Sequence, residues 1–307
     1  MAEHQKDLIR EIERLKRQRN AVILGHNYQP GPIQDISDFV GDSLGLSIQA
    51  AESDADVIVF CGVDFMAETA AILAADKLVL IPELRATCPM AEMASAEEIQ
   101  AKRKEHPGCA VVTYVNSSAA VKAESDICCT SANAVSVLRS IPEEKEVVFV
   151  PDMHLGEYAA KTTGREVILW DGFCPSHHYV KPIEVEREMH KHPGAPVLSH
   201  PECPYEVIEL SDAALSTSGM LKFVRESDAD EFIIVTEFGM LYPLAKQNPT
   251  KRFYCPSAAL ICPNMKVTTL ESVRRALQDS VSPVRVPSHI GDRARLPIER
   301  MLAVPRD

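Results

Sequence analysis

Three Cys-Pro dipeptides stand at almost equal distances along this sequence. They begin at Cys88, Cys174 and Cys262, so the two intervals are 86 and 88 residues. Thiolates hold soft metal ions and iron–sulfur clusters, and three of them leave one metal position free for a substrate. A zinc ion and a [4Fe–4S] cluster with one free iron are both compatible with three thiolates, and the cluster is the better match. The proline after each cysteine removes an amide donor and stiffens the ligand loop.

The remaining cysteines do not share this period. Cys255 is also followed by proline and is the alternative third ligand, but it lies 81 residues after Cys174, so the period favours Cys262. No CxxC pair occurs, which excludes zinc-ribbon and two-cluster ferredoxin patterns. We interpret the other five as buried thiols that pack as small hydrophobic side chains: Cys61, Cys109, Cys128, Cys129 and Cys203.

Three series of polar residues repeat with the same spacing, at intervals of 88 and 86 residues. Together with the cysteines they make four series with one period, which indicates three homologous units of about 87 residues. The members of the polar series are His26, Tyr114 and His200; Tyr28, Asn116 and Glu202; and Ser43, Ser131 and Thr217.

Short apolar runs alternate with helical segments in each unit, an order typical of α/β domains with parallel sheets. A second strand, without assigned bounds, is expected just before each member of the Ser43 series. The first 20 residues are highly charged, with apolar residues at helical spacing from Leu8 to Leu15, and predict an amphipathic surface helix. The predicted strands cover residues 21–25, 57–60, 78–81, 110–114, 147–150, 167–170, 197–199, 232–235 and 252–254.

We therefore predict three homologous three-layer αβα domains with parallel sheets, over residues 1–108, 109–194 and 195–307. Ligands of such sheets bind beyond the carboxyl ends of the strands, where helix N-termini point. If the domains pack around a pseudo-threefold axis with these ends inward, all four series meet in one central cavity. Ser43, Ser131 and Thr217 are then expected to cap helices and face an anion, and ordinary capping is the simpler interpretation.

Composition limits the classes of function. The 307 residues are 46% hydrophobic and carry a formal charge of −12. An acidic surface repels phosphate backbones, which argues against nucleic-acid binding. The sequence shows neither an export signal nor an apolar run long enough to cross a membrane, so we expect a cytoplasmic protein.

Longer segments around the repeated positions resemble the signature segments of the quinolinate synthase family. The resemblance extends from about residue 21 to about residue 301, and the segments occur in the family's order. They are HNYQ (26–29), GDSLG (41–45), ATCPM (86–90), TYVNS (113–117), GFCPSH (172–177), HPE (200–202), STSG (216–219) and CPNMK (262–266).

The resemblance implies a reaction and a cofactor. Iminoaspartate and dihydroxyacetone phosphate condense to quinolinate, with loss of phosphate and two waters, in NAD biosynthesis. The implied cofactor is a [4Fe–4S] cluster held by Cys88, Cys174 and Cys262, with its free iron acting as a Lewis acid. The implied partners are the two small substrates and, transiently, an L-aspartate oxidase.

The resemblance also implies roles for the polar series. The implied catalytic residues are Tyr28, Glu202, His26 and His200, which move protons or hold carboxylates. Tyr28 is a slow base unless a nearby cation or the cluster lowers its pKa. The implied substrate-binding residues are His26, Ser43, Tyr114, Asn116, Ser131, His177, His200, Glu202 and Thr217.

Some alternatives stay open at this level. His178 competes with His177 for the position that faces the cluster, and Tyr114 also suits a packing aromatic at a strand end. Other functions compatible with three thiolates are a different iron–sulfur hydro-lyase acting on a small hydroxy acid, a non-catalytic iron–sulfur sensor, and a structural zinc protein.

Overall fold

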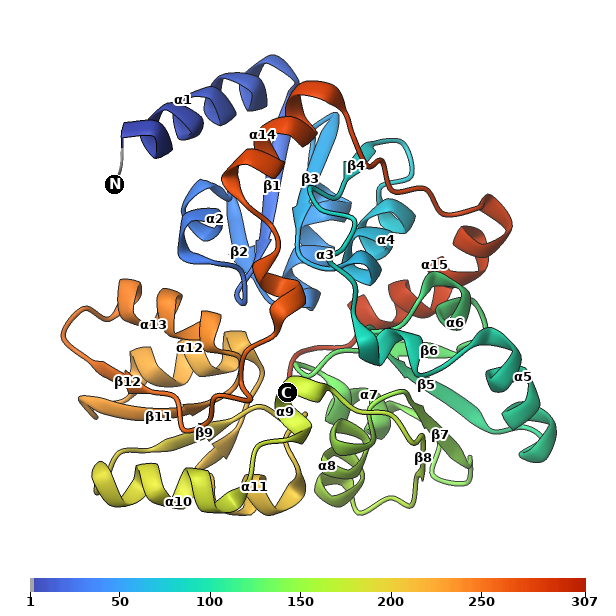
Figure 1. Cartoon of the computed structure of the whole chain (residues 1–307). Coiled ribbons are helices and arrows are strands. Elements are labelled where there is room, and N and C mark those ends of the chain that lie inside the picture. The colour runs from blue at the N-terminus through green and yellow to red at the C-terminus, as the bar shows by residue number, and fades with distance from the viewer. Residues whose placement is uncertain (1–2) are drawn as a thin grey trace.

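The strands form three separate parallel sheets of four strands each in the computed structural model, which describes residues 3–307 (Figure 1). The strand orders are β2-β1-β3-β4, β6-β5-β7-β8 and β10-β9-β11-β12, so every unit repeats one topology. The triple repeat of the sequence is therefore a triple repeat of structure. The strands are β1 (Ala21–His26), β2 (Phe39–Gly41), β3 (Val57–Cys61), β4 (Leu78–Leu80), β5 (Ala110–Tyr114), β6 (Ile127–Cys129), β7 (Val147–Val150), β8 (Ile168–Leu169), β9 (Val197–Ser199), β10 (Ala213–Ala214), β11 (Glu231–Val235) and β12 (Arg252–Tyr254).

The nine strands predicted with bounds are all present, and each sheet adds a second strand at its edge. These edge strands, β2, β6 and β10, have only two or three residues, too few to show an alternating pattern. A local signal does precede them, because a Ser-Asp pair recurs at intervals of 88 and 86 residues. We call these the Ser-Asp pairs: Ser37-Asp38, Ser125-Asp126 and Ser211-Asp212.

The aspartate of each Ser-Asp pair ties its edge strand to the first strand of the same sheet. The carboxylates of Asp38, Asp126 and Asp212 accept backbone N–H groups of β1, β5 and β9 at 2.8, 2.8 and 2.7 Å. In return, the N–H of each aspartate donates to a carbonyl of that strand. The three bonds are equivalent, so the start of the edge strand is specified identically in all units.

Helices connect the strands and cover both faces of each sheet. In the first sheet, Val57 and Val59 pack toward α1, α2 and α14, while Ile58 and Phe60 pack toward α3 and α4. The other two sheets are covered on both faces in the same way, which gives three-layer αβα units. The helices are α1 (Glu3–Gln18), α2 (Gly31–Ile36), α3 (Ser43–Glu52), α4 (Asp64–Leu73), α5 (Ala96–Glu105), α6 (Ala119–Ala123), α7 (Ala134–Ser140), α8 (Met153–Thr163), α9 (Pro175–His178), α10 (Pro182–Lys191), α11 (Tyr205–Glu209), α12 (Thr217–Glu226), α13 (Leu241–Gln247), α14 (Leu270–Asp279) and α15 (Ser288–Leu302), with 3₁₀ turns at Pro89–Glu92, Phe238–Met240 and Pro263–Lys266.

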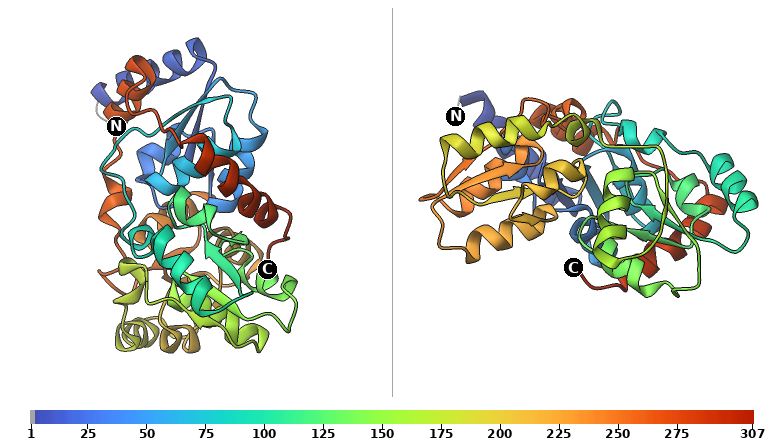
Figure 2. Two further views of the ribbon diagram at one scale, coloured as in Figure 1. Left: turned by 90° about the vertical axis from the view of Figure 1, so that its right-hand side faces the viewer. Right: turned by 90° about the horizontal axis from the view of Figure 1, so that it is seen from below.

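The two ends of the chain pack onto the first two units (Figure 2). The predicted amphipathic helix is α1, which buries Ile12 and Leu15 against the first sheet; residues 1 and 2 of that prediction lie outside the described residues. Helix α14 packs on α1, and α15 packs on α6 and β6 of the second unit. Among residues 3–307, no helix combines the length and apolarity needed to cross a membrane.

Candidate active site

Loops at the carboxyl ends of the strands in all three sheets line one cavity of about 160 Å³. Parallel α/β sheets bind ligands at these ends, because helix N-termini and loops converge there. Every residue that the sequence assigned to the site lines this cavity: His26, Tyr28, Ser43, Cys88, Tyr114, Asn116, Ser131, Cys174, His177, His200, Glu202, Thr217 and Cys262. The repeated positions of three distant segments thus face one space, while their chemical roles remain predictions.

The three period-selected cysteines begin equivalent turns. Cys88, Cys174 and Cys262 each precede a short helical turn whose first residue is proline. Burial raises the pKa of all three thiols, so they are protonated at neutral pH unless a metal binds them. Cys255 packs beside an apolar cluster of the third unit and is not among the lining residues. Three half-buried sulfurs on one cavity fit an iron–sulfur cluster with one iron free of protein ligands.

Buried acids hold two of the cysteine turns, and the sequence reasoning missed them. Asp152 accepts the N–H of Cys174 at 3.2 Å, and Glu237 accepts the N–H of Cys262 at 3.0 Å. Both side chains are fully buried, and Glu237 also pairs with Lys266 at 2.8 Å. Each acid comes two residues after the third strand of its sheet, which is a signal that the sequence offered.

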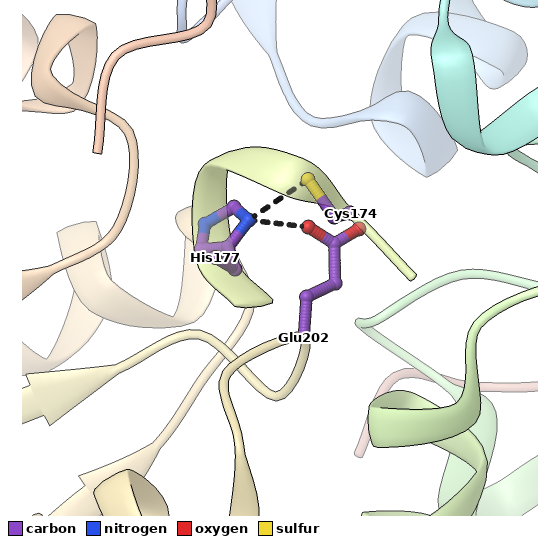
Figure 3. Close-up of side chains that lie close together, drawn as sticks. All are labelled: Cys174, His177 and Glu202. Carbon is purple, nitrogen blue, oxygen red and sulfur yellow. Dashed lines mark hydrogen bonds and ion pairs between the residues drawn. The ribbon is translucent and has the colours of Figure 1, made fainter. Parts of the chain in front are cut away.

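Glu202 contacts several polar side chains of the cavity, and Figure 3 shows it beside His177 and Cys174. Its carboxylate accepts the Tyr114 hydroxyl at 2.6 Å and lies 2.7 Å from Nδ1 of His177. The same His177 nitrogen lies 3.2 Å from Sγ of Cys174, so a thiol, an imidazole and a carboxylate meet in one small volume. Burial alone raises the pKa of Glu202, but His200, His177 and the Tyr114 hydroxyl outweigh it and hold that pKa below its usual range. Glu202 is therefore an ionised base at neutral pH.

His26 and His200 occupy equivalent places at the ends of β1 and β9. In each case the backbone N–H two residues later, on Tyr28 or Glu202, donates to Nδ1 at 3.2 or 3.4 Å. Because Nδ1 accepts, the ring proton is left on Nε2, and that of His200 reaches Oγ of Ser131 at 3.1 Å. Burial lowers the pKa of His26 to about 4 and that of His200 to about 3. Both rings are neutral N–H donors at neutral pH.

Tyr28 is buried, and its hydroxyl bonds Oγ1 of Thr236 at 2.7 Å. Burial and the nearby Glu202 raise the pKa of Tyr28 well above its usual value. The lowered pKa that an acid–base tyrosine needs is therefore not supplied by the residues around it. Sequence reasoning missed Thr236, because the residue after the third strand is Pro151 in the second unit and no repeat marks the position.

The expectation that Ser43, Ser131 and Thr217 cap helices is wrong by one residue or more. The caps of α3 and α12 are Asp42 and Ser216, whose oxygens accept N–H groups of the first turn, and α7 begins only after Asn133. Asp42 and Ser216 accept the N–H groups of Gly45 and Gly219, and the Asp307 carboxylate accepts those of Val135 and Ser136 in α7. Ser43, Ser131 and Thr217 line the cavity instead. Thr217 accepts the Asn27 amide at 2.8 Å.

Contacts in the structure decide two alternatives that the sequence left open, one for His177 and His178 and one for Tyr114. His178 pairs with His154 at 2.8 Å and stacks on Phe173, whereas His177 lines the cavity. The Tyr114 hydroxyl is bonded to Glu202, so this ring does more than pack a strand end.

Asn116 lines the cavity with an unsatisfied oxygen. Its Oδ1 is buried and has no hydrogen-bond partner among the described residues. A buried polar atom without a partner is costly. This oxygen is therefore an acceptor available to a ligand.

Comparison with known proteins gives one consistent result. The family model described as Quinolinate synthetase A protein matches residues 10–303. A quinolinate synthase of Geotalea uraniireducens is 52% identical over 304 residues, which cover 99% of this chain and 100% of the relative. Those of Methanoregula boonei and Methanosarcina barkeri are 55% and 51% identical over 294 and 300 residues, covering 96% and 98% of this chain and 97% and 98% of the relatives. The matched range includes every predicted site residue.

Proposed function

Since this chain belongs to the quinolinate synthase family, we propose how its own residues carry out the family's reaction. The activity is synthesis of quinolinate for NAD biosynthesis. The observation that carries the proposed roles is the single cavity, in which the twelve residues chosen by sequence period lie together with His177. The proposed substrates are iminoaspartate and dihydroxyacetone phosphate, which lose phosphate and two waters as the ring closes.

Cys88, Cys174 and Cys262 are the proposed ligands of a [4Fe–4S] cluster. Their support is the set of three equivalent turns, each with a half-buried thiol on the cavity. When bound, the cluster supplies a Lewis-acidic iron that polarises a hydroxyl leaving group. Asp152 and Glu237 keep two of the sulfurs in place by holding the backbone of their turns.

Neutral donors bind the anionic groups of the substrates in this proposal. His26 presents an Nε2–H group, which can donate to a carboxylate without adding a buried charge. The Nε2–H of His200 donates to Ser131 at 3.1 Å, so His200 orients the Ser131 hydroxyl toward a substrate. The hydroxyls of Ser43, Ser131 and Thr217 face the same cavity and complete the donor set.

Asn116 adds a hydrogen-bond acceptor to this set of donors. Its unpartnered oxygen accepts from a substrate N–H or O–H group. A cavity with both donors and acceptors matches substrates that carry carboxylates, a phosphate, an imine and hydroxyls.

Glu202 and Tyr28 carry the proton transfers in this proposal. Glu202 is ionised and buried, so it takes a proton from a substrate carbon or hydroxyl. Tyr28 keeps its proton at neutral pH and therefore acts first as an acid, toward the oxygen that leaves. Tyr114 and His177 hold the Glu202 carboxylate from two sides, at 2.6 and 2.7 Å.

We further propose that the three units pack around a pseudo-threefold axis with the cavity at its centre, and that the unit boundaries lie near residues 108 and 194. The identical strand orders support this arrangement.

A cytoplasmic location stays a prediction. The nine unpaired cysteines agree with it, because reducing compartments keep thiols free. Contact with an L-aspartate oxidase stays a prediction as well.

The test is anaerobic reconstitution with iron and sulfide, followed by incubation with both substrates and detection of quinolinate. We expect quinolinate and phosphate in equal amounts, and neither product when one substrate is left out. Glu202→Gln is the matched variant, because it keeps the size of the side chain and one of its two accepting oxygens but removes the base. Dehydration of a small hydroxy acid without ring formation would favour the hydro-lyase alternative, and a zinc-loaded protein without iron uptake would contradict the cluster.

A further inference from the structure

The cavity has an acidic lining, although the proposed substrates are anions. The side chains of Asp42, Glu202 and Glu237 line it, and among the described residues no lysine or arginine does so. Iminoaspartate carries two carboxylates and dihydroxyacetone phosphate carries a phosphate, so an uncompensated acid in the lining would repel them. Each of these acids therefore needs a partner that offsets its charge.

The three acids have different partners. Glu202 is held by an imidazole and a phenol, as described above, and Glu237 pairs with Lys266. Asp42 pairs with Arg306, whose two terminal nitrogens lie 2.5 and 3.1 Å from its two carboxylate oxygens. Burial raises the pKa of Asp42, but the Arg306 guanidinium and neighbouring donors outweigh burial and hold that pKa below its usual range. Asp42 is thus charged at neutral pH, and Arg306 carries the opposite charge.

Arg306 follows α15 and is fixed on the second unit by the residue next to it. The N–H of Asp307 donates to the carbonyl of Ala132 at 2.7 Å. The carboxylate of Asp307 accepts two N–H groups of α7 at 3.0 and 2.7 Å. The backbone of this segment is therefore anchored on the second unit, while the Arg306 side chain reaches Asp42 in the first.

A glycine makes room for the ion pair of Asp42 and Arg306. Gly45 lies in the first turn of α3, and its N–H donates to Oδ1 of Asp42 at 2.7 Å. A Cβ at Gly45 would lie 3.2 Å from that oxygen and 3.3 Å from Nη2 of Arg306, closer than side chains usually pack. The glycine therefore admits the guanidinium beside the start of α3, where Ser43 lines the cavity.

We propose that Arg306 is a positioning residue for substrate binding, which offsets the charge of Asp42 so that the adjacent Ser43 hydroxyl can bind an oxyanion of a substrate. This inference rests on the binding role proposed above for Ser43. Arg306 is not among the residues that line the cavity, so it acts through Asp42 rather than by touching the substrate. Because both oxygens of Asp42 are paired with the guanidinium, this wall of the cavity offers a hydroxyl donor without an uncompensated negative charge.

The test compares Arg306→Met, which keeps the length of the side chain but removes its charge, with Arg306→Lys, which keeps the charge. In the iron-loaded Arg306→Met enzyme we expect the Kd for quinolinate or the KM for dihydroxyacetone phosphate to rise about tenfold. Arg306→Lys should stay within about threefold of the parent. In both variants kcat should stay within about threefold and iron content should not change. The matched control is Arg293→Met, because the exposed Arg293 pairs with Glu124 on the surface and does not line the cavity.

The two ligands distinguish the two oxyanions that the substrates offer. A rise in the Kd for quinolinate, which has only carboxylates, assigns a carboxylate to the Ser43 side of the cavity. A rise confined to the KM for dihydroxyacetone phosphate assigns the phosphate. Either result supports the inference, whereas Arg306→Met values within threefold of the parent for both ligands would overturn it. An Arg306→Lys enzyme that binds as weakly as Arg306→Met would overturn it as well.

A double variant with Asp42→Asn separates charge compensation from a loss of structure. Asparagine caps helices as well as aspartate does, so Asp42→Asn removes the charge and keeps an acceptor for the N–H of Gly45. In this background Arg306→Met should weaken binding less than about threefold, because no charge is left to offset. A larger loss would overturn the inference, since Arg306 would then act on the substrate or on the fold. Should Asp42→Asn not take up iron, Asp42→Ser repeats the comparison with another capping residue.

Failure of this inference is distinct from failure of the proposed function. A parent enzyme that forms and binds quinolinate, together with unchanged binding in Arg306→Met, would remove the role of Arg306 and leave the proposed function intact. A parent that neither forms nor binds quinolinate would contradict the proposed function, and this inference would fall with it.

Discussion

The amino ends of the edge strands and the carboxyl ends of the sheets use the triple repeat in opposite ways. At the amino ends the Ser-Asp pairs are identical in all units, and each serine also bonds a carbonyl four residues earlier, at 2.8 to 2.9 Å. At the carboxyl ends the positions repeat but the residues differ: His26, Tyr114 and His200 in one series, Tyr28, Asn116 and Glu202 in the next.

The difference follows from what each end must do. Starting an edge strand is the same task in every unit, so one residue type serves all three. An unsymmetrical pair of substrates needs different groups on its different sides, so equivalent positions carry different side chains. The cysteines are the exception at the carboxyl ends, since the proposed cluster takes three equal ligands.

Removing one of the three equivalent cysteines should have the largest effect. We expect Cys88→Ala, Cys174→Ala and Cys262→Ala each to lose the brown chromophore and all measurable activity, because a cluster with two protein ligands is poorly held. Iron analysis, the anaerobic absorption spectrum and quinolinate formation measure this. Cys255→Ala is the control and should keep all three properties. Full activity in any one of the three variants would remove that residue from the ligand set.

Making two units alike at a carboxyl end should have the next largest effect. Glu202→Asn gives the third unit the residue that the second unit has at the equivalent position, Asn116. We expect kcat to fall by about 100-fold or more, because the cavity loses its ionised base, while iron content stays normal. The exposed Glu206→Asn, on the next helix, is the control. A kcat within threefold of the parent would show that the asymmetry of this series is not catalytic.

Loosening the cysteine turns should have a smaller effect. We expect Asp152→Ala and Glu237→Ala to release iron to a chelator about tenfold faster, as for other lost outer-shell hydrogen bonds. Asp152→Asn and Glu237→Gln should release it at nearly the parent rate, since an amide oxygen still accepts the cysteine N–H. Iron release followed by absorbance measures this. Equal rates for the alanine and amide variants would assign the effect to charge rather than to the hydrogen bond.

His26 and Tyr114 hold equivalent positions in the first and second units. We expect His26 to make the stability of the protein depend on pH below neutrality, which Tyr114 does not. The pKa of His26 is about 4 in the folded chain, below the roughly 6.5 of an unfolded histidine. Between these values the unfolded chain binds the extra proton, so stability falls as pH falls from 6.5 toward 4.

For His26 this loss amounts to about 2 kcal/mol between pH 7.5 and pH 5. Urea unfolding of the parent and of His26→Asn at the two pH values measures it. The variant should lose about 2 kcal/mol less than the parent over this interval. An equal loss in both proteins would contradict the assignment to His26.

Removing one Ser-Asp contact should have the smallest effect. Asp212→Ala leaves the N–H of Val197 without its 2.7 Å partner, and we expect the free energy of unfolding to fall by about 1–2 kcal/mol. kcat and iron content should not change, because this bond lies at the end of the sheet away from the cavity. The exposed Asp228→Ala is the control, expected within about 0.5 kcal/mol of the parent. A change in kcat for Asp212→Ala would show that the Ser-Asp contacts influence the cavity at the opposite end of the sheet.

The sequence by itself determined the repeat, nine of the strands and thirteen of the residues that line the cavity. Equivalent positions in a repeated fold take equivalent places. The period alone therefore predicted that Cys88, Cys174 and Cys262 face one cavity. The edge strands were left without bounds because two or three residues carry too little pattern, although the Ser-Asp pairs marked where they begin.

Only the tertiary structure decided which side chains these residues touch. Thr236 meets Tyr28 from 208 positions away and His177 from 59, and no local pattern encodes such a meeting. The helix caps also depended on which neighbouring oxygen reaches the free amides, and Asp42 and Ser216 do so in place of Ser43 and Thr217. Periodicity predicts which surface of its unit a residue lies on. Its hydrogen bonds depend on which atoms of other units lie within about 3 Å, and tertiary packing determines that.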